Sequence, residues 1–198
     1  MGKIITISRE FGSGGRYVGR LVSEILNIPF YDEELTRMLA EQSNYSSEFI
    51  EKSEDVRTSS FLFNLSTEGV FMNNTYGAMA PNDKLFVLQN NIIKELADKG
   101  PCVIIGRCGD YILRDREDVL RVFVTCDMPN RVERCVKYYG IPEKDVEKSL
   151  KKKDKARSSN YSYYTGGEWG VVKNYDITIN SGSFGVEKCA EIIAELAK

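Results

Sequence analysis

The chain has 198 residues, of which 42% are hydrophobic and 28% charged, which is enough for one well-packed domain or a domain with a mobile insert. Lys and Arg number 27 against 29 Asp and Glu, and a net charge of −2 argues against a nucleic-acid partner or an anionic membrane surface. No apolar run approaches the roughly 20 residues that span a bilayer, and no signal-peptide pattern opens the chain, so we expect a cytoplasmic protein.

Two residue types restrict the chemistry. The 5 cysteines include no CxxC pair and are typical of reduced core thiols. Histidine is absent, which excludes Ser/His and Cys/His nucleophile systems and the HExxH zinc site. Any reaction must therefore use carboxylates, hydroxyls, backbone amides, arginines and lysines.

The N-terminal residues predict a strand, a glycine loop and a helix in immediate succession. Residues 3–8 form a β-branched run that leads into the cluster Gly12, Ser13, Gly14 and Gly15. Apolar residues then recur at the spacing of one helical face between positions 18 and 26. Residues 28–31 predict a short second strand, and Asp32 stands at the N-cap position of a helix through about residue 42.

The remaining elements alternate in the same way after an irregular segment. Residues 43–81 have no clean period over most of their length and are expected to form an inserted, partly helical cap. Beyond them we expect strands at 102–105, 119–125 and 175–180, helices at about 83–98, 130–139, from 142 onward and 185–198, and a Tyr- and Gly-rich loop at 161–170. Continuous apolar strands separated by helices predict a three-layer α/β domain with a five-stranded parallel sheet.

The glycine loop is the sharpest functional signal. Glycines between a first strand and a helix let backbone N–H groups surround an anion at the positive end of the helix. A flexible βα turn is the simpler reading, but the position of the loop favours phosphate binding. A dinucleotide-binding loop of the GxGxxG type is the other alternative, with Asp32 as its ribose-binding acid, although Tyr17 stands where the third glycine belongs.

Arginines at three later places provide the second signal. Arg107 follows Gly106 at the carboxyl end of an apolar strand, where open α/β sheets bind ligands, and can hold a phosphate through two hydrogen bonds. Arg131, Arg134 and Arg157 lie on the late helices. Individually they read as surface residues, but together they could form a cationic lid over transferring phosphates.

These motifs resemble, in order, those of bacterial cytidylate kinases. The closer resemblance, over essentially the full length, is to the cytidylate kinase-like branch, whose loop reads ISREFGSGG, as residues 7–15 do here, and whose later motif reads GRC. The resemblance implies the P-loop nucleoside monophosphate kinase fold. It further implies a core of residues 1–32, 82–140 and 171–198, an acceptor-binding insert at about 33–81 and a lid at about 141–170.

The departures from the kinase pattern concern the catalytic loop itself. Laid against GxxxxGK[ST], Arg9 stands at the first glycine, Gly15 at the lysine, and Arg16 at the Ser/Thr that would ligate Mg²⁺. GRC replaces GRD, with Asp110 as the nearest carboxylate, and the spacing from Asp32 to Arg37 is one residue short of the family's. Cytosine specificity therefore does not transfer.

We expect an ATP- and Mg²⁺-dependent kinase of a nucleoside monophosphate (CMP-like) or a similar small anionic acceptor. The loop residues Gly12, Ser13, Gly14 and Gly15 are assigned to the donor phosphates, and Asp32, Arg37 and Arg107 to the acceptor. The catalytic assignment is Arg16, Arg131, Arg134 and Arg157, and either Arg16 or Arg9 could replace the lysine. A nucleotide-binding regulatory protein with little or no transferase activity is the alternative, and an NAD(P)-dependent enzyme is a third.

Overall fold

The computed structural model describes residues 2–43, 45–50 and 80–198. Its centre is a five-stranded, fully parallel sheet in the order β2-β3-β1-β4-β5, which confirms the expected α/β class. The strands are β1 (Ile4–Arg9), β2 (Phe30–Tyr31), β3 (Val103–Ile105), β4 (Val119–Thr125) and β5 (Ile177–Asn180). Because β3 lies between β1 and β2, the order differs from the dinucleotide-binding order 3-2-1-4-5-6, in which β2 adjoins β1. The topology therefore excludes the dinucleotide-binding alternative.

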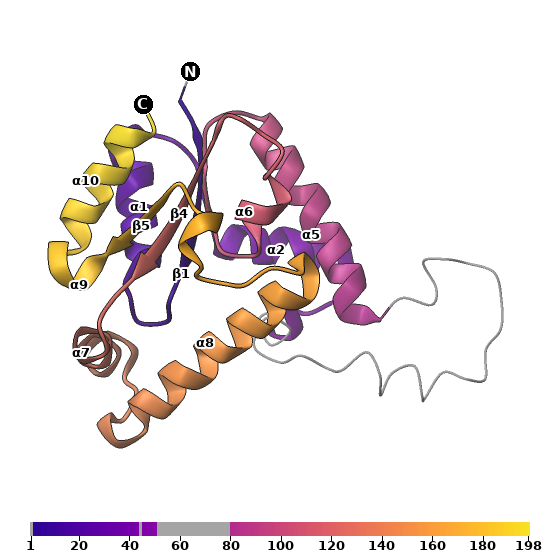
Figure 1. The fold of residues 1–198 in the computed structure, drawn as a ribbon. Coiled ribbons are helices and arrows are strands. Elements are labelled where there is room, and N and C mark those ends of the chain that lie inside the picture. Colours follow the sequence, from indigo (N-terminus) through magenta and orange to yellow (C-terminus); the bar gives the residue numbers. More distant parts are fainter. Residues whose placement is uncertain (1, 44, 51–79) are drawn as a thin grey trace, which may run out of the picture.

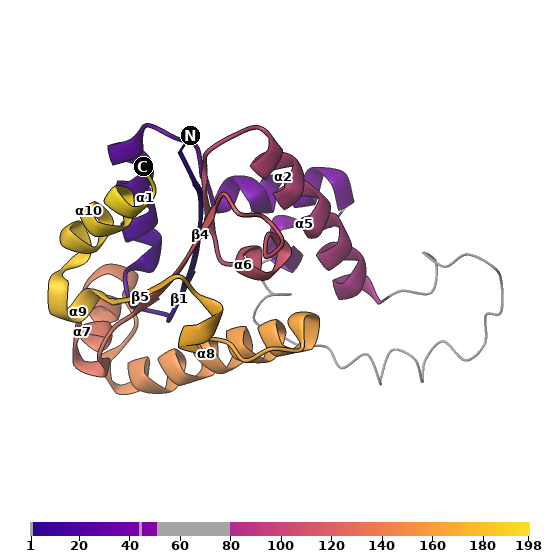
Figure 2. The ribbon, with the colours of Figure 1, turned by 45° about the horizontal axis from the view of Figure 1, so that its top comes forward.

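Helices cover both faces of this sheet. They are α1 (Gly15–Leu26), α2 (Glu33–Ser43), α5 (Pro81–Asp98), α6 (Gly109–Ile112), α7 (Met128–Tyr139), α8 (Glu143–Thr165), α9 (Ser181–Phe184) and α10 (Val186–Leu196), with a 3₁₀ turn at Val172–Asn174. Figures 1 and 2 show α1 and α10 on one face and α2, α5 and α6 on the other. The result is the three-layer arrangement that buried parallel strands require.

The pleat of β1 supplies side chains to both layers. Ile5 and Ile7 pack with Val18 and Val22 of α1 and with the buried residues of α10. Ile4 points to the opposite layer, among the apolar residues of α2 and α5. These three isoleucines are at most 1% exposed, and each such burial stabilises the fold by about 1.5–3 kcal/mol. The strand that leads into the glycine loop is therefore firmly anchored.

Helix α8 occupies a special position, across the end of the sheet at which the strands finish (Figures 1 and 2). The turn before it uses Gly140 in the left-handed conformation (φ 63°) to end α7. A third apolar cluster, Cys135, Val146 and Leu150, joins the two helices. The glycine loop thus lies against α7 and α8, while both chain termini lie at the far end of the sheet.

The structure corrects one expected element. The Tyr- and Gly-rich stretch begins as helix, because α8 continues to Thr165 and ends only at Gly166, which is left-handed (φ 69°). Tyr161 explains the extension, since it is buried and its hydroxyl donates to Asp110 at 2.8 Å. Of the expected insert, residues 51–79 lie outside the described residues. Within the described ranges, no helix combines the length and apolar character needed to cross a membrane.

Candidate nucleotide and acceptor site

The glycine loop between β1 and α1 is held by its carbonyl groups. Arg157 Nη1 donates to the carbonyl of Arg9 at 2.8 Å, and Arg131 Nε donates to that of Phe11 at 2.8 Å. Arg134 Nη1 donates to the carbonyl of Gly12 at 2.6 Å. The hydroxyl of Ser181 donates to the next carbonyl, that of Ser13, at 2.5 Å. Four carbonyls of the loop are thus directed toward α7, α8 and α9.

This arrangement fixes the direction of the N–H groups. In a planar trans peptide the N–H points opposite to the preceding carbonyl, so the N–H groups of Gly12 and Gly14 face away from Arg131 and Ser181. Gly12 and Gly14 are left-handed (φ 79° and 77°), whereas Ser13 between them is not. Backbone that alternates between left-handed and right-handed residues forms a concavity of N–H groups that binds anions. A pocket lined by the loop glycines adjoins it, at the N-terminus of α1.

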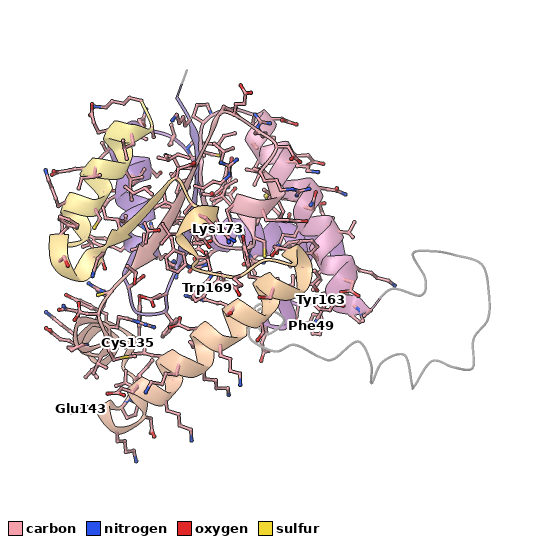
Figure 3. All side chains as sticks on the ribbon, viewed as in Figure 1. Phe49, Cys135, Glu143, Tyr163, Trp169 and Lys173 are labelled. Atoms are coloured by element: carbon pink, nitrogen blue, oxygen red, sulfur yellow. The ribbon has the colours of Figure 1, made fainter. Side chains whose placement is uncertain are left out.

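Close packing excludes side chains at Gly12. A Cβ there would lie 2.9 Å from Sγ of Cys135 and 3.2 Å from the carbonyl oxygen of Arg131, and the left-handed backbone adds strain. Cys135 is labelled on α7 in Figure 3. The hydroxyl of Ser13 also faces inward, because it donates to Glu10 O at 2.8 Å and accepts from the N–H of Gly15 at 3.3 Å. Ser13 therefore shapes the loop through its hydroxyl.

A partly buried charge network supports the loop on the side of α7 and α8. Arg131 is 4% exposed, forms an ion pair with Asp154, and lies 3.4 Å from Oε1 of Glu10. Asp154 also accepts from the N–H of Phe11 at 2.7 Å. The other oxygen of Glu10 accepts from the hydroxyl of Thr125 and the N–H of Cys126, at 2.6 and 2.9 Å. One guanidinium thus faces two carboxylates, whose other contacts are N–H and hydroxyl donors, and the network links β1, β4, α7 and α8 at the loop.

A second pocket opens at the carboxyl ends of β1 and β3. Three arginines, three side-chain amides and four aromatic residues dominate its lining, and Ser8, Leu85, Gly106 and Cys108 complete it. The arginines are Arg9, Arg107 and Arg157, the amides are Asn82, Gln89 and Asn160, and the aromatic residues are Phe86, Tyr161, Tyr164 and Trp169. Figure 3 labels Trp169 between α8 and the sheet. Phe86 of α5 stacks on Tyr164 of α8 with ring centroids 4.0 Å apart. This stacking joins the two walls of the pocket.

Arg107 is held in place by polar contacts. Its Nη2 donates to Thr36 Oγ1 at 2.7 Å, and its Nη1 donates to Gln89 Oε1 at 3.3 Å. In return, Nε2 of Gln89 donates to the backbone carbonyl of Arg107 at 2.9 Å. Gly106, Arg107 and Cys108 all have positive φ (65°, 54° and 54°). Left-handed backbone at two consecutive non-glycine residues costs free energy, and such strain clusters at ligand-binding sites.

Asp110 lies beneath the second pocket and is 3% exposed. It accepts from the hydroxyl of Tyr161 at 2.8 Å and from that of Ser8 at 3.5 Å. Burial raises the pKa of the Asp110 carboxyl, although both hydroxyl contacts act in the opposite direction. Burial also raises the pKa of Tyr161, which therefore stays a hydrogen-bond donor at neutral pH. The carboxyl expected near the GRC motif is consequently a buried support of the pocket.

The sequence-predicted residues fall into separate groups. Arg107 lines the second pocket, while Asp32 lines both the glycine-loop pocket and a further hollow that it shares with Arg37. Arg16 pairs with Asp32 and Glu33, at 2.5 Å in both cases, and its side chain is 46% exposed. The hydrogen bond from Arg16 lowers the pKa of Glu33. The three predicted acceptor residues are therefore not brought together in one pocket.

Several residues at the centre of the site were missed from the sequence. The amides Asn82, Gln89 and Asn160 and the rings Phe86, Tyr164 and Trp169 line the second pocket but form no local motif. The tyrosine-rich end of α8 could have indicated them, because aromatic residues within a predicted lid are candidates for ligand contact. Helix α5 carried no such signal, since Phe86 and Gln89 fit an ordinary amphipathic helix.

The donor set does not fit a magnesium ion held by the protein. Mg²⁺ prefers hydroxyl, carboxylate and phosphate oxygens in octahedral geometry. Arg16 replaces the hydroxyl residue, and the same arginine pairs with Asp32. Within the described ranges no three Asp, Glu, Cys or His residues gather as a metal site. Backbone N–H groups and arginines dominate, and they suit phosphate.

The strand order and the glycine loop together define the P-loop kinase class of fold. The sequence matches the model of the cytidylate kinase-like family over residues 4–183, and the chain belongs to that family. None of the curated proteins matches it.

Solved structures agree on the fold. An uncharacterized protein from Eubacterium ventriosum is 27% identical, with 98% of each chain covered and a TM-score of 0.73. Shikimate kinase from Bacteroides thetaiotaomicron is 15% identical, with 99% of this chain and 98% of that chain covered and a TM-score of 0.54. APS kinase from Mycobacterium tuberculosis, solved with AMPPNP and APS, is 18% identical over 98% and 96% of the two chains, with a TM-score of 0.50.

Proposed function

We propose that the protein transfers the γ-phosphoryl group of ATP to a nucleoside monophosphate (CMP-like) or a similar small anionic acceptor. One observation carries the proposal: the glycine-loop pocket and the second pocket both include Arg9 and Arg157 in their linings. Two adjoining pockets with cationic side chains at their junction suit transfer of a phosphoryl group from one ligand to another. The family and the kinase folds of the structural relatives support the same reaction class.

The donor would bind on the glycine loop. The N–H groups of Gly12 and Gly14 and the N-terminus of α1 would face its phosphates, while the N–H groups of Ser13 and Gly15 donate within the loop to the carbonyl of Glu10 and the hydroxyl of Ser13. A further hollow adjoins Gly14 and is lined by Tyr17 and Tyr138 among others, between α7 and the N-terminus of α10. Its aromatic side chains suit the base of the nucleotide. Arg134 borders this hollow while it donates to the loop.

The acceptor would bind in the second pocket. Arg107 suits an anionic group, and the amides of Asn82 and Asn160 suit the mixed donors and acceptors of a heterocycle or a sugar. In the transfer, an acceptor oxygen forms the new bond to the γ-phosphorus. The bond from phosphorus to the bridging oxygen breaks, and its electron pair leaves with ADP. Such a reaction depends on positioning and charge neutralisation, so it needs no histidine.

Domain and site assignments follow from this proposal. Residues 33–81 would serve as the acceptor-binding insert and 141–170 as the lid, with Arg16, Arg131, Arg134 and Arg157 acting near the transferring group. The contacts of Arg131 and Arg134 with loop carbonyls support a positioning role for these two residues. ATP would enter with Mg²⁺ held by its own phosphate oxygens.

The test is a panel assay in which ATP meets nucleoside monophosphates and other small phosphorylated or carboxylated acceptors, with ADP as the readout. We expect ADP formation that depends on one acceptor class. Gly12→Ala should abolish it, because the added Cβ meets Cys135 and the loop must shift. Gly100→Ala is the matched control, since Gly100 also has positive φ (129°) but opens onto free space. Tight ATP binding with no acceptor-dependent ADP would support the regulatory alternative instead.

A further inference from the structure

Arg9 runs from the end of β1 along the space above Gly15. A Cβ built on Gly15 would lie 2.6 Å from Cβ and 3.1 Å from Cγ of Arg9. Real Cβ atoms do not approach a neighbour closer than 3.0 Å, so a side chain at position 15 and the stem of Arg9 exclude one another. Position 15 is the lysine position of an ordinary P-loop. The stem of Arg9 thus occupies the space from which that lysine would start.

The guanidinium end of Arg9 lies against a second glycine. A Cβ on Gly106 would overlap Nη1 of Arg9 and lie 3.1 Å from its Cζ, and Gly106 also has positive φ (65°). The two glycines come from separate motifs, the loop after β1 and the turn after β3. Both leave room for the same side chain, and Arg9 contributes to both pockets that its path connects.

We infer that Arg9 supplies the positive charge that a P-loop lysine supplies to the β- and γ-phosphates, an inference that rests on the proposed function. Its charge would neutralise the bridging oxygen as the bond to the γ-phosphorus breaks, while the electron pair stays on ADP and Arg9 itself forms no covalent bond. Arg16 is the competing candidate next to the loop. Arg16 lines the glycine-loop pocket and pairs with Asp32 and Glu33, but unlike Arg9 it does not line the second pocket and so does not reach the junction of the two.

The first experiment compares binding of ATP, ADP and AMP by calorimetry, which needs no knowledge of the acceptor. Arg9→Met keeps the unbranched stem over Gly15 and removes the charge. We expect wild type to bind ATP more tightly than AMP, and Arg9→Met to lose at least tenfold in ATP affinity while AMP affinity changes less than twofold. Arg114→Met is the matched control, because Arg114 packs on Tyr111 and lines neither pocket. Thermal unfolding checks that each variant is folded.

The second experiment moves the charge back to its ordinary place. In Arg9→Gly/Gly15→Lys both the Cβ and the stem at position 9 are removed and a lysine can start from position 15, so ATP affinity should return to within about threefold of wild type. Gly15→Lys alone should bind ATP poorly, because Arg9 still fills the space. Rescue by the double variant is a result that a purely structural role of Arg9 would not give.

The outcomes separate the two levels of the argument. If wild type binds ATP no more tightly than AMP, the proposed function fails and the inference fails with it. If wild type prefers ATP and Arg9→Met keeps that preference, or if the folded double variant stays as weak as Arg9→Met, the inference alone is overturned. Loss in Arg9→Met with recovery in the double variant supports both.

Discussion

The glycine loop and the turn after β3 end neighbouring strands, yet their arginines have opposite relations to the backbone. At the glycine loop, the side chains of Arg131 and Arg134 donate to loop carbonyls, so the arginines hold the main chain. At the β3 turn, Thr36 and Gln89 accept from Arg107, so the surroundings hold the arginine. An arginine near a phosphate site can therefore be the support of the site or the group that is supported. The difference predicts which substitutions affect folding and which affect ligand binding.

The largest expected effect on folding is a loss of stability when Arg131 is replaced by methionine. The variant leaves Asp154 and Glu10 without their counter-charge, and because these side chains are 19% and 24% exposed the cost should be about 2 kcal/mol, between that of a surface pair and that of a fully buried one. We expect the free energy of unfolding in urea to fall by that amount. Arg131→Lys is the control for charge alone, and it should lose less. A variant of unchanged stability whose turnover is lost would return Arg131 to the catalytic group that the sequence suggested.

The next expected effect is weaker binding of the acceptor when Arg107 is replaced by alanine. Loss of a charge-assisted contact with an anionic group costs about 1.5–3 kcal/mol, so the apparent binding constant of the acceptor should rise tenfold or more. ATP affinity should stay within twofold, because Arg107 does not line the glycine-loop pocket. Steady-state kinetics with each substrate varied in turn measure both. Unchanged acceptor kinetics in folded protein would remove Arg107 from the site.

Gln89→Leu sharpens the same comparison by keeping Arg107 and removing its support. The guanidinium loses one acceptor and the carbonyl of Arg107 loses its donor. We expect acceptor binding to weaken by about fivefold, since the loss of one supporting hydrogen bond costs about 1 kcal/mol. An effect as large as that of Arg107→Ala would show that Gln89 contacts the acceptor itself.

The sequence predicted the layers of the fold because they depend on local patterns. The apolar run of β4 was predicted at its observed bounds. Helix α7 begins two residues before the predicted start and ends where predicted; Asp127 and Pro129 stand at its beginning and Gly140 at its end. The site was harder, because Gly106 is far from Arg9 and Gly15 in sequence and the three residues come together only when β1 and β3 lie side by side. The sequence around an arginine does not show whether its side chain will hold the protein backbone or bind a ligand. Only the acceptors around each guanidinium distinguish the two roles.

A smaller effect concerns pH and the buried Asp110. Burial raises the pKa of this carboxyl in the folded state, so the folded protein holds the proton more tightly than the unfolded chain does. Its contribution to stability is therefore most favourable below the ordinary carboxyl pKa and declines as pH rises through the raised value. Asp110→Asn, whose side chain does not titrate, should gain stability relative to wild type as the pH rises above about 4, the ordinary carboxyl pKa. Unfolding at several pH values measures the difference, and a constant difference would contradict the argument.

The smallest effect is optical and uses Trp169, the single tryptophan of the chain. Its ring lines the second pocket and packs edge-on against Phe123, with centroids 5.2 Å apart, whereas the glycine-loop pocket contains no tryptophan. An acceptor that enters the second pocket should therefore change the tryptophan emission, because it displaces water from the indole or moves the ring. AMPPNP alone should change it much less. Trp169→Phe removes the signal and identifies its source, so titration of the wild type with candidate acceptors also serves as a search for the substrate. A full emission change with AMPPNP alone, and none with any acceptor that supports ADP formation, would mean that the two pockets have the opposite assignment.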